Sequence, residues 1–289
     1  MEHMISNGEL SLSVAENGAE MMSLKKDGAE YLWQGDPEFW SGRAYNLFPI
    51  CGRLTDGKYT FKGKTYEMMI HGFAKLSLFT LAEKGENFLT FTLESNEETK
   101  KMYPFGFVLT VKYTLEGNCV RTDYSVKNTG DGKMYFTLGG HPGFNIPFDG
   151  KGSFEDYYIE FPESCAPRAL KMDNCYMSDE TVPFALDGGT KYALHHTMFD
   201  NDAIFLCDMP KEVTLKSNKT DRSVTLKYPD MKYLGLWHKP RTSAPYICIE
   251  PWRGVPAYYK KIDDLETKRD MLTLAPKDEY TTHIDIIIK

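Results

Sequence analysis

Several patterns that would narrow the function at once are missing from this chain of 289 residues. It has no phosphate-binding loop, no dinucleotide fingerprint and no G-x-S-x-G nucleophile motif, so these signatures support neither nucleotide chemistry nor a serine nucleophile. No apolar run approaches the roughly 20 residues that a membrane-spanning helix needs. The first residues also lack the basic and then apolar pattern of a signal peptide. We therefore expect no membrane association and a cytoplasmic location.

Cysteine pairs and basic patches are also missing. None of the six cysteines forms a C-x-x-C pair, and a chain of this length needs no disulfides to stabilise a core. We expect buried thiols in a reducing compartment at the six positions, which are Cys51, Cys119, Cys165, Cys175, Cys207 and Cys248. The net charge is -7, with no cluster of Lys and Arg that would favour a nucleic-acid partner.

The chain is instead rich in short segments of alternating apolar and polar residues. Such segments recur about every ten residues, separated by turn signals such as Asn17-Gly18 and Gly117-Asn118. Helical patterns are few and short, at 96–102 and 262–266. Together with 42% hydrophobic residues and no break in composition, this predicts one all-β antiparallel domain over 1–289, built of two large sheets packed face to face.

One stretch combines a strand pattern with a histidine that could transfer protons. The residues 133–138 alternate as a strand does, and Gly139, Gly140, Pro142 and Gly143 follow. Glycine and proline at these spacings predict a turn, with His141 at its mouth. An imidazole titrates near neutral pH and can give or take a proton there. Taken alone, such a histidine can equally well serve only to hydrogen-bond its neighbours.

Four further residues are candidates for the same site. His71 stands between an apolar residue and Gly72-Phe73, much as His141 does. Glu250 directly follows an apolar run, where an acid is hard to bury without a partner. Each has a structural alternative: a hydrogen-bonded histidine for His71, a strand cap for Asp202, and a surface salt bridge for Arg53. The motif of His195, His196 and Asp200 resembles a metal site, but lacks a second ligand cluster with zinc spacing, so we predict a solvated loop and no metal.

Together these residues form an acid–base set beside aromatic side chains. A pyranose has an apolar C–H face and a rim of hydroxyls, so aromatic faces combined with polar groups are typical of a sugar site. A base that takes the proton of the C1 hydroxyl and an acid that protonates the ring oxygen would open a hemiacetal. The aromatic residues expected near this site are Phe73, Phe144, Trp237 and Trp252.

In this combination the sequence resembles the aldose 1-epimerase (galactose mutarotase-like) family, and within it the LacX-like branch. The histidine stretch and the Glu250-Pro251-Trp252 segment carry the resemblance most specifically, while the matches at Arg53 and Asp202 are weaker. The matching motifs span positions 52 to 252 in the family's order. They are Gly52-Arg53, His71-Gly72-Phe73, Tyr103-Pro104-Phe105, Gly140-His141-Pro142-Gly143-Phe144-Asn145, Asn201-Asp202, Leu236-Trp237 and Cys248-Ile249-Glu250-Pro251-Trp252.

The resemblance implies an antiparallel β-supersandwich with an open sugar cleft, a monosaccharide substrate and no cofactor. It implies that Glu250 is the general base at the C1 hydroxyl and His141 the general acid at the ring oxygen. His71 would assist at the ring oxygen, and Asp202 and Arg53 would hydrogen-bond sugar hydroxyls. Phe144 and Trp237 complete the expected substrate-binding set.

The region after Arg53 departs from the galactose enzymes. It reads Leu54-Thr55-Asp56-Gly57, as in the LacX-like branch, so the sequence does not identify which sugar is the substrate. A hexose-6-phosphate mutarotase would need extra cations near the cleft, for which Lys75 and Arg253 are available.

Two other function classes are carried as alternatives. A carbohydrate-binding protein without turnover would not need a matched acid and base. A glycoside hydrolase using Glu250 with Asp202 would leave the histidines without a role. The sequence leaves the oligomeric state open.

Overall fold

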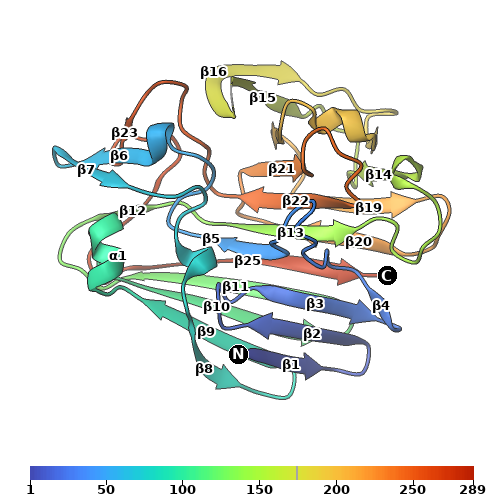
Figure 1. Ribbon diagram of the computed structural model, residues 1–289, viewed down its shortest axis with the longest axis horizontal. Helices are drawn as coiled ribbons and strands as arrows, with labels where there is room; N and C mark the ends of the chain where they lie inside the picture. The colour runs from blue at the N-terminus through green and yellow to red at the C-terminus, as the bar shows by residue number, and fades with distance from the viewer. Residues whose placement is uncertain (174) are drawn as a thin grey trace.

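The computed structural model describes residues 1–173 and 175–289, and its regular secondary structure is almost entirely β-strand (Figure 1). The largest sheet has nine strands, in the order β17 (Lys191–Ala193), β14 (Tyr157–Glu160), β19 (Glu212–Ser217), β20 (Ser223–Lys227), β25 (Glu279–Ile288), β11 (Cys119–Asn128), β10 (Phe107–Glu116), β9 (Phe88–Glu94) and β8 (Thr80–Lys84). The second has seven, in the order β16 (Tyr176–Pro183), β15 (Arg168–Asp173), β18 (Ile204–Cys207), β21 (Tyr233–Trp237), β22 (Tyr246–Trp252), β13 (Gly139–Asn145) and β5 (Ala44–Leu47). The predicted all-β antiparallel class is therefore confirmed.

Smaller sheets complete the fold. A four-stranded meander, dark blue in Figure 1, runs through β1 (Glu2–Ser6), β2 (Leu10–Ala15), β3 (Met21–Lys26) and β4 (Ala29–Glu30). The others are β12 (Met134–Phe136) with β24 (Leu272–Leu274), and β23 (Asp263–Asp264) with β6 (Lys58–Phe61) and β7 (Lys64–Glu67). Among the described pairs of strands, β23 with β6 runs parallel.

The helices are short. They are α1 (Glu97–Met102) and four 3₁₀ turns, η1 (Thr55–Gly57), η2 (Ala74–Leu76), η3 (Phe154–Asp156) and η4 (His196–Phe199). The helix expected at 96–102 is confirmed: the Asn96 side chain accepts hydrogen bonds from the amides of Glu98 and Thr99, which caps α1. In the described part of the chain, no helix combines the length and the apolar character needed to cross a bilayer.

Alternation along the strands explains the layers. In β22, the side chains of Ile247 and Ile249 enter the core shared with β10, β11 and β25 of the large sheet. Successive residues of a strand point to opposite faces, so Cys248 and Glu250 point away from that core. One face of the seven-stranded sheet therefore packs against the nine-stranded sheet, and its other face is available to form a site.

Three local expectations were wrong. The segment expected to turn at Gly139–Gly143 is strand β13, because it pairs with β5 on one side and β22 on the other. The helix expected at 262–266 contains the short strand β23 instead, held by pairing with β6. Of the six cysteines, which are all free thiols, Cys119, Cys165 and Cys175 are only half-buried.

Candidate active site

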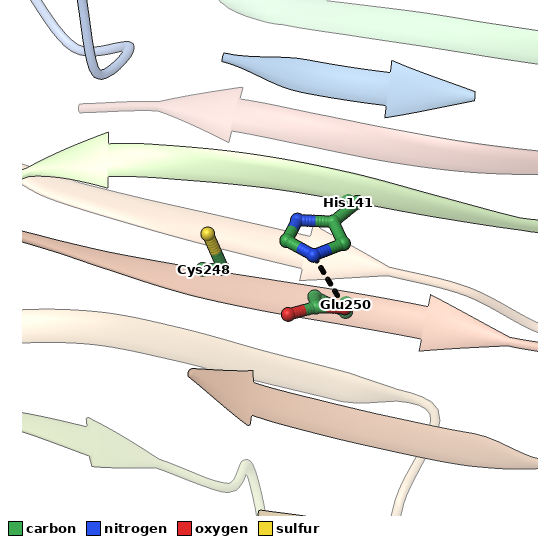
Figure 2. Close-up of side chains that lie close together, drawn as sticks. All are labelled: His141, Cys248 and Glu250. Atoms are coloured by element: carbon green, nitrogen blue, oxygen red, sulfur yellow. Dashed lines mark ion pairs between the residues drawn. The ribbon is translucent and has the colours of Figure 1, made fainter. Parts of the chain in front are cut away.

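Neighbouring strands bring the acid and the imidazole together. Gly139 pairs with Trp252 and Gly143 with Cys248, a register that places His141 directly opposite Glu250. The two side chains project from β13 and β22 toward each other (Figure 2). On the other side of β22, Gly235 of β21 pairs with Glu250 and adds no side chain there. The acid therefore has an imidazole on one side and, on the other, a glycine whose missing side chain leaves room for the carboxylate next to Phe205.

The pair is buried and in contact. His141 Nε2 lies 3.2 Å from Glu250 Oε2, and the two residues are 6% and 2% exposed. Burial raises the pKa of Glu250 well above its ordinary value, and the nearby Asp202 carboxylate raises it further. Burial lowers the pKa of His141 to about 3. Because burial disfavours a net charge, the favoured state of the pair has one titratable proton for the two groups, so that its total charge is zero.

His71 is the second imidazole at the site. Its ring lies edge-on to that of His141, with centroids 5.3 Å apart. The amide of Gly52 donates to His71 Nδ1 at 3.2 Å, so the neutral ring carries its proton on Nε2 and is a donor there. Burial and the neighbouring His141 lower the pKa of His71 well below its ordinary value, which keeps the ring neutral.

The predicted hydroxyl-binding residues also reach the cavity. Asp202 accepts a hydrogen bond from the Trp237 indole N–H at 2.9 Å, which fixes the carboxylate against β21. Arg53 and Asp202 both line the cavity, as do His71, His141 and Glu250. The backbone φ angles of His71 and Asp202 are 66° and 80°, a strained region for these residues. Such strain is concentrated at ligand and catalytic sites.

Aromatic side chains that the sequence reasoning did not select form part of the wall. The Trp40 indole lies over the His141 ring with centroids 4.9 Å apart, and it meets Trp237 edge-on at 5.8 Å. Tyr45 and Lys75 also line the cavity. The run Phe39-Trp40-Ser41-Gly42 carries an aromatic and glycine signal like those around the two histidines, and could have indicated Trp40. The cavity volume is about 230 Å³.

The structure places Phe144 away from the cavity. It is 0% exposed, belongs to the core between the sheets, and does not line the cavity. His141 and Phe144 are three residues apart in one strand, so their side chains point to opposite faces. The predicted contact of Phe144 with a sugar is therefore wrong, and Trp40 takes the place next to His141.

The solvated loop expected at His195 and His196 is only partly correct. His195 is exposed, but His196 packs against Phe154 with ring centroids 4.2 Å apart. His196 Nδ1 lies 3.1 Å from Nε2 of the fully buried His238. These two histidines contact each other and are not among the residues of the cavity wall.

Comparisons with known proteins show the family of the chain and the relatives of its fold. The family model described as Aldose 1-epimerase matches residues 1–284. The plasmid LacX protein of Lactococcus lactis subsp. lactis is 35% identical over 295 residues, covering 98% of each chain. A galactose mutarotase related enzyme from Lactobacillus acidophilus shares 33% identity and superposes with a TM-score of 0.95, covering 100% of this chain and 97% of the other. A galactose mutarotase-like protein from Lactobacillus casei gives 31% identity and a TM-score of 0.93, covering 100% of both.

Proposed function

The chain belongs to the aldose 1-epimerase family, and we propose that it interconverts the α and β anomers of an aldose by opening and reclosing the sugar ring. The observation that carries this proposal is the contact of His141 with Glu250 inside a small open cavity. At about 230 Å³ the cavity is smaller than the roughly 300–1,000 Å³ of pockets for drug-sized ligands, which favours a monosaccharide over an oligosaccharide.

The reaction needs one proton donor and one proton acceptor. Glu250 takes the proton from the C1 hydroxyl as O1 forms a carbonyl, while the bond from C1 to the ring oxygen breaks and His141 protonates that oxygen. The open aldehyde rotates about C1–C2. The hydroxyl then adds to the other face of C1, returning its proton to His141 as Glu250 protonates O1.

The pair is matched to this sequence of steps. In its net-neutral state it holds one transferable proton and one vacant acceptor position. Burial raises the pKa of Glu250 and lowers that of His141, which places this proton on Glu250 before a sugar binds. The cycle therefore starts after the proton has passed to His141 across the 3.2 Å contact, and a full cycle leaves the number of protons unchanged. O1 and the ring oxygen are both bonded to C1, so the acid and the base must lie close together, as His141 and Glu250 do at 3.2 Å. General acid and general base assistance each contribute roughly 10²–10⁴-fold.

The surrounding groups support binding of the ring. The N–H of His71 Nε2 is available to the ring oxygen, and Asp202 and Arg53 can hydrogen-bond hydroxyls at the rim. The indoles of Trp40 and Trp237 offer apolar faces to C–H groups of the sugar.

A phosphorylated aldose is a second candidate because the wall carries an additional cation. Lys75 lines the cavity, with its ammonium 5.2 Å from the centroid of the Tyr45 ring, and Arg53 lies in the same wall. Arg253, the other cation considered from the sequence, is not part of that wall. Lys75 and Arg53 together could pair with a phosphate on C6.

Polarimetry tests both candidates. Freshly dissolved α-glucose, α-galactose and other aldoses, together with their 6-phosphates, would be followed with and without the protein. We expect faster mutarotation of at least one sugar, abolished in Glu250→Gln and in His141→Asn. If a 6-phosphate is preferred, Lys75→Met should lower kcat/KM for it more than for the unphosphorylated sugar.

The same panel separates the rival functions. Binding of a sugar, seen by calorimetry, with mutarotation no faster than in buffer would favour a carbohydrate-binding protein. Release of nitrophenol from nitrophenyl glycosides would favour a glycoside hydrolase.

A further inference from the structure

A third potential ligand atom lies beside the acid–base pair. Cys248 and Glu250 are two residues apart in β22 and therefore share a face, and His141 faces them from β13 (Figure 2). The position opposite Cys248 is Gly143, which contributes no side chain. Two adjacent strands thus present an imidazole, a carboxylate and a thiol around one point.

These three donors are close enough to bind one ion. An imidazole nitrogen of His141, the thiol sulfur of Cys248 and a carboxylate oxygen of Glu250 all lie within 4.8 Å of one another. Tetrahedral zinc, with bonds of about 2.0–2.3 Å, requires its ligand atoms to be roughly 3.3–3.8 Å apart. Since none of the separations exceeds 4.8 Å, the ligand atoms must approach one another by at most about 1–1.5 Å, which rotations of the side chains can supply. The buried His141 Nδ1 has no hydrogen-bond partner among the described residues, so no such bond opposes a rotation of its ring.

We propose that His141, Cys248 and Glu250 form a binding site for Zn²⁺, and that occupation of this site inhibits the sugar chemistry. Nitrogen, sulfur and oxygen donors suit Zn²⁺, whereas the sulfur disfavours Mg²⁺ and Ca²⁺. One thiolate and one carboxylate neutralise the dication, so the buried complex carries no net charge. Three protein ligands leave a fourth position for water or a hydroxyl.

Binding of the metal is a substitution of protons. One Zn²⁺ enters, the thiol of Cys248 loses its proton, and the proton shared by His141 and Glu250 is released, which gives two protons to solvent. The imidazole lone pair and the carboxylate are then bound to the metal. Because the proposed function uses these same two groups to transfer protons, the metal-bound protein is expected to be inactive. This consequence rests on the proposed function, but metal binding itself does not.

Cobalt provides a test that does not depend on activity. Co²⁺ would be added to metal-free protein, and absorption from charge transfer between thiolate and cobalt would be recorded. We expect the band to saturate at one equivalent and to disappear when Zn²⁺ displaces the cobalt. It should be absent from Cys248→Ala and from the better size-matched Cys248→Ser, while Cys51→Ala, which removes another fully buried thiol, should retain it.

The spectra are interpreted only for variants that are folded. Near-ultraviolet circular dichroism would establish that each variant keeps its tertiary structure. No thiolate band in the wild-type protein, or a band retained in folded Cys248→Ala, would overturn the site.

Inhibition is measured separately by polarimetry. Zn²⁺ should suppress mutarotation by wild-type protein and Cys51→Ala, and the concentration for half-inhibition should rise at least about tenfold in Cys248→Ser, since loss of a ligand costs more than the 10–100-fold typical of a supporting group. Equal inhibition of Cys248→Ser and wild type would overturn the inhibitory role. A protein that binds Co²⁺ through Cys248 but shows no mutarotation with any sugar would retain the metal site and lose the proposed function.

Discussion

Two pairs of titratable side chains in the described part of the chain, His196 with the buried His238 and His141 with Glu250, differ in how their polar atoms are satisfied. In the pair of His196 and His238, His238 Nδ1 donates to the carbonyl of Lys239 at 2.8 Å, and its Nε2 therefore accepts from His196. In the pair of His141 and Glu250, His141 Nδ1 has no hydrogen-bond partner in the described part of the chain, and both residues line a cavity. A closed network stabilises a structure, whereas a pair facing a cavity with unsatisfied atoms has capacity left for a ligand.

The pKa shifts alone do not separate these pairs. Burial lowers the pKa of His238 to about 4 and that of His141 to about 3. The groups around the first pair are Glu155, whose carboxylate is 3.8 Å from His196 Nε2, and the more distant Asp200. What distinguishes the second pair is access to the cavity, and variants of each pair test that distinction.

The largest effect is expected on activity. Glu250→Gln and His141→Asn should each lower kcat/KM by roughly 10²–10⁴-fold, because each removes one proton-transfer partner. His196→Gln, which alters the closed pair, should leave kcat/KM close to wild type. A coupled assay with a dehydrogenase specific for one anomer measures these values. Comparable losses in all three variants would remove the distinction between the pairs.

The closed pair should instead contribute to the loss of stability in acid. The unfolded state binds a proton at a histidine below about pH 6.5, whereas folded His238 does so only near pH 4, so folding loses stability as the pH falls through this window. The loss attributable to His238 is up to about 3 kcal/mol. Urea unfolding at several pH values should show a shallower dependence in His238→Gln than in the wild type. The contributions of His71 and His141 are the same in the wild type and in His238→Gln, so the comparison isolates His238. If the free energy of unfolding of the two proteins depended equally on pH, this assignment would be wrong.

A smaller effect is expected from filling the space beside the base. A Cβ at Gly235 would lie 3.2 Å from both Glu250 Cβ and Phe205 Cε1, closer than is comfortable. Gly235→Ala should therefore displace the carboxylate by a few tenths of an ångström and lower kcat about tenfold, since a shift of 1 Å can cost about 10²-fold. A crystal structure of the variant would show whether Glu250 has moved. If kcat fell while Glu250 kept its position, displacement of the carboxylate would not be the cause.

The smallest effect concerns substrate binding. Trp237→Phe keeps an aromatic face but removes the hydrogen bond to Asp202. Loss of one hydrogen bond of about 1 kcal/mol should raise KM roughly fivefold with little change in kcat. Initial rates over a range of sugar concentrations separate the two constants, and a fall in kcat alone would argue that Asp202 acts in the chemical step.

Much of the fold follows from local sequence. The alternation from Phe107 to Glu116 and from Cys119 to Asn128 predicts a hairpin that the structure contains, with Phe107 opposite Asn128. Glu250 could be selected because an acid after an apolar run conflicts with simple burial. Such conflicts between local pattern and environment are expected at functional sites.

Other features depend on contacts between distant segments. The Gly139–Gly143 segment has the local signals of a turn, yet pairing with strands on both sides holds it extended. The same pairing sends Phe144 into the core. Cys248 meets His141 only through a register between strands about a hundred residues apart, and Trp40 reaches His141 from the first fifth of the chain. No local pattern encodes these juxtapositions.

The central claim is that Glu250 and His141 pass protons across a closed sugar ring. Two-dimensional exchange NMR of an aldose labelled at C1 measures this most directly, because it records transfer between the α and β signals at equilibrium. With an accepted sugar, we predict exchange peaks in the presence of wild-type protein and only the uncatalysed background with Glu250→Gln. Exchange by folded Glu250→Gln as fast as by the wild type would contradict the claim.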